Sequence, residues 1–145
     1  KLQKELKFKY VSINEIFEKA DIISLHVPGT KETKHMINDK TLRKVKTTAG
    51  IVNTARGSVV DTKAILKALK TKKLAWYAAD VLEIEHSIFT DKEMGKTNKE
   101  LLKHERSYIT PHMAYATTDA VTRVLTQTMQ QITDFQKGKP VNFVN

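Results

Sequence analysis

The residues best suited to chemistry in this sequence stand just after its apolar stretches. Arg56 follows one such stretch, and Asp80 closes the next, with Glu85 just beyond it. His112 follows the last short stretch. The planar guanidinium of an arginine suits bidentate capture of a carboxylate or phosphate, and a histidine paired with a carboxylate suits proton transfer. The set predicts proton transfer on an anionic substrate.

The elements that would position these residues alternate between strand and helix. Apolar, strand-like stretches occupy 22–27, 51–54, 75–81 and 107–110. Helical patterns occupy 12–19, 38–45, 61–70, 98–104 and 118–137. This alternation predicts an α/β protein with a parallel sheet covered on both faces. The carboxyl ends of parallel strands meet at one edge, where open α/β sheets hold ligands. Taken singly, each candidate residue is more often a surface or structural residue, so their shared position carries the hypothesis.

The stretch 51–61 organises the prediction, because it reads as a strand, a turn and the start of a helix. Arg56 stands at the tip of the strand, and we expect Gly57 to supply the backbone freedom of a tight turn. Asp61 suits the N-cap of the following helix. That helix has three apolar residues at helical spacing, Ile65, Leu66 and Leu69.

Composition excludes several classes of function. The chain has 145 residues, no cysteine and a formal net charge of +9. The lack of cysteine excludes disulfides, thiolate metal sites and cysteine nucleophiles. The lysines are scattered, without a basic run that aromatic residues interrupt, so we expect no nucleic-acid partner. No apolar run is long enough to cross a bilayer. We expect a cytoplasmic protein with no metal site and no membrane partner.

Four motifs resemble the D-isomer-specific 2-hydroxyacid dehydrogenases in composition, order and spacing. They are Ala-Asp-Ile-Ile-Ser-Leu-His-Val-Pro at 20–28, Val-Asn-Thr-Ala-Arg-Gly at 52–57 with Val-Asp at 60–61, Asp-Val at 80–81 with Glu85, and Thr-Pro-His-Met-Ala at 110–114. The stretches 87–91 and 114–117 are most similar to the D-lactate and D-hydroxyisocaproate dehydrogenase branch. The resemblance implies a partial Rossmann-type, doubly wound parallel sheet, the second half of an NAD-binding domain, plus a closing C-terminal helix.

The resemblance also implies a role for each site residue. Arg56 would bind the substrate carboxylate, and His112 would be the acid/base with Glu85 as its partner. A carboxylate beside an imidazole favours the charged, proton-donating form. The implied NAD site consists of Val27, Pro28, Thr33, Thr54, Ala55, Arg56, Asp80 and His112. NAD supplies the hydride chemistry, so the protein has to bind, orient and polarise.

The sequence departs from the family in one respect. A Gly-x-Gly-x-x-Gly turn binds the pyrophosphate in such domains, and an acidic residue about 20 residues later binds the ribose. The five glycines here are too far apart to form that turn, and the chain does not begin with methionine. We therefore expect a C-terminal fragment, with residues 1–115 in the NAD-binding domain and residues 116–145 returning to the substrate domain.

Two hypotheses follow from this. The leading one is a fragment of an NAD-dependent D-2-hydroxyacid dehydrogenase, which is a homodimer when complete and reduces a small 2-keto acid such as pyruvate or a branched analogue. The alternative is a non-catalytic half-domain that acts as a basic binding module. The intact set of Arg56, Glu85 and His112 favours the first for the complete protein, whereas the missing glycine-rich turn favours the second for the chain as it stands.

Overall fold

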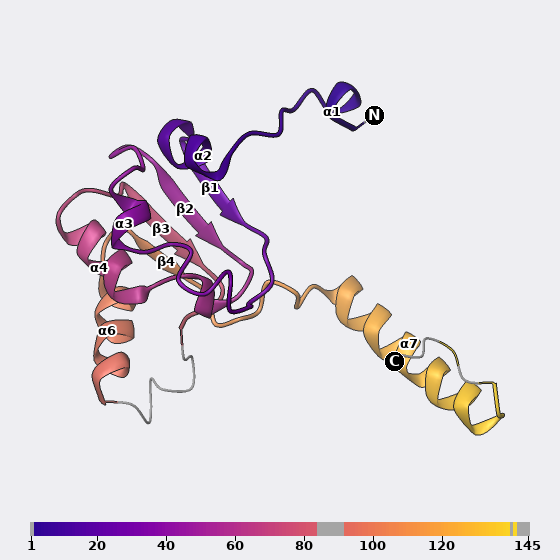
Figure 1. The fold of residues 1–145 in the computed structure, drawn as a ribbon. Coiled ribbons are helices and arrows are strands. Elements are labelled where there is room, and N and C mark those ends of the chain that lie inside the picture. Colours follow the sequence, from indigo (N-terminus) through magenta and orange to yellow (C-terminus); the bar gives the residue numbers. More distant parts are fainter. Residues whose placement is uncertain (1, 84–91, 140, 142–145) are drawn as a thin grey trace. The chain divides into compact units, whose positions relative to one another are not determined.

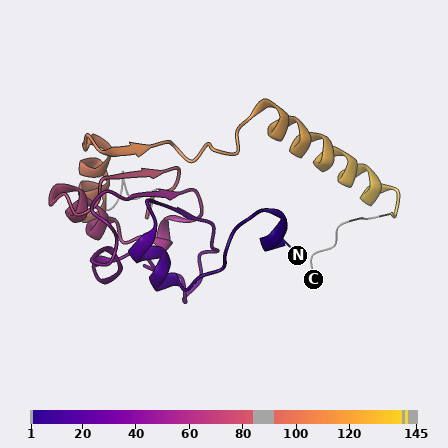
Figure 2. The ribbon, with the colours of Figure 1, turned by 90° about the horizontal axis from the view of Figure 1, so that it is seen from above.

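A parallel sheet is the centre of the fold. A computed structural model describes residues 2–83, 92–139 and 141. Four strands lie side by side and run in the same direction, in the order β1-β2-β3-β4 (Figures 1 and 2). They are β1 (Ile22–Leu25), β2 (Gly50–Asn53), β3 (Trp76–Ala79) and β4 (Ser107–Ile109). The predicted parallel α/β sheet is confirmed, and each strand lies within or next to its expected stretch.

Helices precede, connect and follow the strands, and most of them begin at a side-chain cap. They are α1 (Leu2–Glu5), α2 (Ile13–Lys19), α3 (Asp39–Leu42), the 3₁₀ turn η1 (Gly57–Val59), α4 (Thr62–Lys70), α6 (Lys92–Lys103) and α7 (Thr118–Gln136). Side chains that accept a backbone N–H cap α2, α3, α4 and α7, namely Ser12, Asn38, Asp61 and Thr117. Helix α6 begins upstream of the expected position.

The hydrophobic core lies between the sheet and the helices on it. Ile51 of β2 and Ile65 and Leu69 of α4 are fully buried. Helix α4 packs on β3, and α6 packs on β4 and α4. Burial alternates along β1 and β3, and Ile22 is 62% exposed, so one face of these strands is more open than we expected. The strand order runs in one direction, and right-handed crossovers then place their helices on one face, as in one half of a doubly wound sheet.

The chain divides into two compact units, Lys1–Pro111 and His112–Asn145. The second unit contains α7, in which no residue is buried. Its apolar side chains stand 40–71% exposed: Val121, Val124, Leu125, Met129, Ile132 and Phe135. The domain boundary at 115/116 stays a prediction. Within the described part of the chain, no helix has both the length and the apolar character needed to cross a membrane.

Candidate active site at the carboxyl edge of the sheet

Arg56 stands at the carboxyl edge of the sheet, three residues after β2 ends. It has an extended backbone (φ −147°, ψ 142°) and an exposed side chain. Its guanidinium Nη1 donates to the Ala55 carbonyl at 2.7 Å. Ala55 is buried and Thr54 is exposed, so the turn alternates between core and surface. The guanidinium is therefore available at the strand tip, where we expected an anion to bind.

Asn53, the last residue of β2, shapes the Arg56 turn. Its side chain is fully buried. The Oδ1 atom accepts the Ala55 N–H at 3.1 Å, and the Nδ2 atom donates to the Arg56 carbonyl at 3.1 Å. Tyr77, on the neighbouring strand, is buried on the same face of the sheet as Asn53. Burial raises the pKa of Tyr77, so its hydroxyl stays protonated in the fold.

Gly57 is required by a close approach rather than by a left-handed backbone. Among the described glycines only Gly138 has a positive φ. Gly57 does lie in a tight turn, but the backbone freedom of glycine is therefore not the reason that the turn needs it. A Cβ at position 57 would lie 2.0 Å from the Leu82 carbonyl oxygen and 2.6 Å from the Glu83 nitrogen. The Arg56–Gly57 turn thus packs directly on the backbone that follows β3.

The loop after β1 contacts the Arg56 turn. The Thr33 hydroxyl donates to the Pro28 carbonyl at 2.6 Å and accepts the Thr30 N–H at 2.9 Å, which closes the loop. A Cβ at Gly29 would lie 3.2 Å from Cβ and Cγ of Arg56. Val27 packs on the core, and Pro28 is exposed. The structure thereby brings the predicted cofactor residues of the first strand next to Arg56.

Asp80 and Thr110 join the ends of β3 and β4. Asp80 is 6% exposed, and its N–H donates to the Asn53 carbonyl at 3.0 Å. The Thr110 hydroxyl donates to Asp80 Oδ1 at 2.5 Å, and the Thr110 N–H donates to the Ala79 carbonyl at 2.9 Å. Asp80 is thus held firmly at the edge where Arg56 also stands.

The two residues predicted to transfer the proton are Glu85 and His112. His112 is the first residue of the second unit, is exposed, and has a left-handed backbone with φ 52°. Such a conformation is uncommon outside glycine and often marks functional residues. Glu85 lies outside the described residues, so its pairing with His112 stays a prediction.

One long-range hydrogen bond near the site joins a histidine to a carboxylate and has no counterpart among the sequence predictions. His35 Nε2 and Glu83 Oε1 lie 2.6 Å apart, although 48 positions separate the two residues. The other oxygen of Glu83 accepts the Thr62 N–H at 3.3 Å, and the Glu83 carbonyl accepts the Asn98 amide at 3.1 Å. The His35 N–H donates to the Ser58 carbonyl at 2.9 Å. These contacts bind the segment after β3 to the turn that carries Arg56. Nothing local in the sequence signals a contact over this distance.

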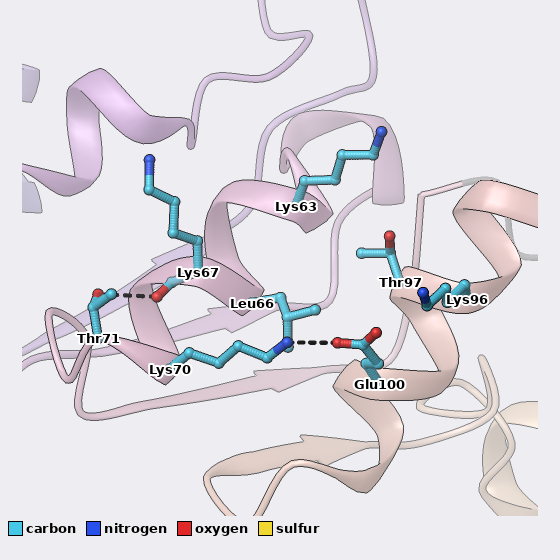
Figure 3. A pocket seen from close by; sticks show the side chains of 8 residues that line it. All are labelled: Lys63, Leu66, Lys67, Lys70, Thr71, Lys96, Thr97 and Glu100. Carbon is cyan, nitrogen blue, oxygen red and sulfur yellow. Dashed lines mark hydrogen bonds and ion pairs between the residues drawn. The ribbon is translucent and has the colours of Figure 1, made fainter.

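A second, basic surface lies between α4 and α6. Four lysines and one glutamate are among the residues that line a hollow of about 500 Å³ there (Figure 3): Lys63, Lys67, Lys70, Lys96 and Glu100. Lys70 pairs with Glu100 at 2.5 Å, and Lys67 pairs with Asp39 at 3.1 Å. The neighbouring ammonium groups of Lys70 and Lys96 lower the pKa of Glu100. Part of the positive charge is therefore neutralised within the fold.

Comparison with known proteins identifies the family of this chain. Residues 1–114 match the sequence profile described as D-isomer specific 2-hydroxyacid dehydrogenase, NAD binding domain. A 2-hydroxyacid dehydrogenase homolog of Zymomonas mobilis is 39% identical over 95% of this chain, which spans 43% of that protein. The D-lactate dehydrogenase of Lactobacillus delbrueckii is 37% identical over 93% of this chain, and a glyoxylate reductase of Korarchaeum cryptofilum is 40% identical over 99%. The chain spans 42% and 41% of their lengths.

Solved structures show the same fold at similar identity. The NAD-complexed D-isomer specific 2-hydroxyacid dehydrogenase of L. delbrueckii ssp. bulgaricus superposes with a TM-score of 0.85 at 34% identity, over 97% of this chain and 44% of its own. The Aquifex aeolicus D-lactate dehydrogenase, complexed with NAD and lactic acid, has a TM-score of 0.83 at 36% identity, over 90% of this chain and 41% of its own. The predicted resemblance is confirmed: this chain belongs to the D-isomer-specific 2-hydroxyacid dehydrogenase family, and residues 1–114 correspond to its NAD-binding domain.

Proposed function

We propose that this chain is the C-terminal part of the NAD-binding domain of a D-2-hydroxyacid dehydrogenase that reduces a small 2-keto acid, pyruvate or a branched analogue, to the D-2-hydroxy acid. The observation that carries the proposal is the gathering of Arg56, the Thr33-closed loop and Asp80 at one edge of the parallel sheet. Family membership and the D-lactate dehydrogenases among the relatives support it.

The residues at this edge fit part of NAD. Thr33, Thr54 and the buried carboxylate of Asp80 provide hydroxyl and carboxylate groups that suit the ribose and amide groups of a dinucleotide. No Gly-x-Gly-x-x-Gly turn is present in the sequence, so the pyrophosphate would need residues from outside this chain. When bound, NAD supplies the hydride chemistry.

The chain's own residues would provide binding and proton transfer. The guanidinium of Arg56 would hold the substrate carboxylate through its planar fork and so orient the keto carbon. His112 would hold the proton that the keto oxygen receives, and Glu85 would stabilise the charged imidazole. The Thr110–Asp80 bond would fix the strand end that leads into His112.

The test compares the 145-residue chain with the complete dehydrogenase that contains it. We expect the complete enzyme to oxidise NADH with pyruvate or a branched 2-keto acid and to yield the D-product. The isolated chain should show no turnover and only weak NAD binding by calorimetry, because half of the dinucleotide site is missing. A complete protein that oxidises NADH with none of these 2-keto acids would refute the proposal. Micromolar NAD binding by the isolated chain would refute the reasoning about the missing turn.

A further inference from the structure

We propose that Asn53 is a positioning residue for substrate binding, which acts through Arg56 and is itself held in place by Tyr77. The proposal rests on the function proposed above, because it concerns how Arg56 is oriented toward a 2-keto acid. It assigns a role to a fully buried strand residue that is not among the residues predicted to bind the substrate or the cofactor.

The first step is that the backbone of Asn53 is fixed by both neighbouring strands. In the sheet register Asn53 is opposite Leu25 of β1 and opposite Ala79 of β3. The Asn53 carbonyl also accepts the Asp80 N–H at 3.0 Å. Asn53 is therefore among the most firmly anchored residues next to the site, and its side chain starts from a defined point.

The second step is that the Asn53 side chain holds the Arg56 turn through two hydrogen bonds. Its amide spans the turn, since one end accepts from Ala55 and the other donates to Arg56, each at 3.1 Å. The Arg56 side chain also folds over the Ala55 carbonyl. Loss of the Asn53 amide would free the Thr54–Ala55 and Arg56–Gly57 peptide groups at once, and the guanidinium would move with them.

The third step is that Tyr77 leaves the Asn53 amide little freedom to rotate. Tyr77 is 2% exposed and lies on β3 opposite Ile51, so it shares a sheet face with Asn53, two residues along β2. Burial raises the pKa of its hydroxyl, and the Asn53 side chain, which can donate to that hydroxyl, opposes the rise. A buried polar group that has a partner restricts the rotation of that partner. We expect this contact to leave Arg56 in one arrangement.

The experiment is a double-mutant cycle in the complete dehydrogenase, with Asn53→Ala, Arg56→Ala and the double variant. Displacement of a substrate-orienting group by about 1 Å costs on the order of 10²-fold. We expect Asn53→Ala to reduce kcat/KM for the 2-keto acid about 10- to 100-fold, with NADH affinity unchanged. In the Arg56→Ala background the same substitution should cost less than about twofold, because residues that act as one unit are not additive.

Asn38→Ala is the matched control. Asn38 also spans a turn with both ends of its amide, at the N-terminus of α3, and its Nδ2 donates to the His35 carbonyl at 2.7 Å. This substitution should lower thermal stability while kcat/KM stays within about twofold of wild type, since the cap lies outside the Arg56 turn. It separates loss of a turn-spanning amide from loss of an oriented arginine.

Tyr77→Phe keeps the buried ring and decides the question if Asn53→Ala does not fold. Removal of the hydroxyl that faces Asn53 should lower kcat/KM by roughly 2- to 10-fold, the change that corresponds to one hydrogen bond. The loss should vanish when Arg56 is alanine. Equal losses in both backgrounds, or no loss with Arg56 present, would overturn the inference. If Arg56→Ala itself leaves kcat/KM unchanged, the assignment of Arg56 in the proposed function fails instead.

Discussion

The close approach of Gly57 to the backbone after β3 predicts a large effect for the smallest possible substitution, Gly57→Ala. The added methyl carbon would lie 2.0 Å from the Leu82 oxygen, 2.2 Å from the Leu82 carbonyl carbon and 2.6 Å from the Glu83 nitrogen. Ordinary contact begins near 3.4 Å, so the two backbones must separate by about 1.4 Å. All three atoms belong to the main chain, so no side-chain rotation relieves the clash.

The cost follows from two opposing terms. Overpacking of a close-packed site costs roughly 1–3 kcal/mol, and a forced shift of the main chain belongs at the upper end. Replacing glycine with alanine restricts the unfolded chain, which returns about 0.4–1 kcal/mol. We expect a net loss of about 2 kcal/mol in the free energy of unfolding. For a chain of this size that corresponds to a fall of about 6 °C in Tm.

The assay is urea unfolding of the 145-residue chain, followed by circular dichroism at one fixed protein concentration. Gly29→Ala is the control, because its added carbon would meet only side-chain atoms at 3.1–3.2 Å, from Ser58 and Arg56. Those atoms need to move only a few tenths of an ångström, so Gly29→Ala should change the unfolding free energy by less than about 1 kcal/mol. Equal stability of Gly57→Ala and wild type would show that the turn does not press on Leu82.

Three further predictions concern the site and its supporting residues. Arg56→Lys in the complete enzyme should reduce kcat/KM for the 2-keto acid by roughly 10²-fold or more with NADH affinity nearly intact, because lysine lacks the bidentate fork; near-normal efficiency would remove Arg56 from its role. Glu85→Gln should move two features of the pH profile to lower pH, the alkaline fall of keto-acid reduction and the rise of hydroxy-acid oxidation. His112→Gln should nearly abolish the reaction in both directions. An unmoved pH profile in Glu85→Gln, or substantial activity in His112→Gln, would refute the acid/base pair. Burial raises the pKa of Tyr77 in the fold, so its contribution to the free energy of unfolding is present below the unfolded pKa of about 10 and declines as pH rises above that value. The alkaline loss of stability should therefore be smaller in Tyr77→Phe than in wild type, and equal losses would contradict this.

The order of elements could be predicted because its signals are local. Asp61 suits an N-cap, and in the structure its side chain accepts the Ala64 N–H at 3.1 Å. Short apolar runs gave the four strands. Parallel strands that alternate with helices then place their carboxyl ends at one edge, which is why sequence patterns alone predict Arg56 and Asp80 at that edge.

The supports of the site could not be predicted, because they depend on contacts between distant segments. The reason for Gly57 lies in Leu82, a residue 25 positions later. His35 and Glu83 are 48 positions apart, and neither has a distinctive local pattern. In the sequence Asn53 is indistinguishable from an ordinary strand end. Only its side-chain hydrogen bonds to the Ala55 N–H and the Arg56 carbonyl reveal its role.

The sheet topology also bears on how this chain folds. Ile22 pairs with Gly50, Gly50 with Trp76, and Tyr77 with Ser107, so each pairing closes a loop of roughly 30 residues at nearly the same entropic cost. No strand has to wait for a partner from the far end of the sequence. We therefore expect the sheet to assemble strand by strand in the order of synthesis, with β1 and β2 able to pair before β4 has left the ribosome. Mutations in β1 or β2 should then slow refolding more than equally destabilising mutations in β4, which should mainly speed unfolding.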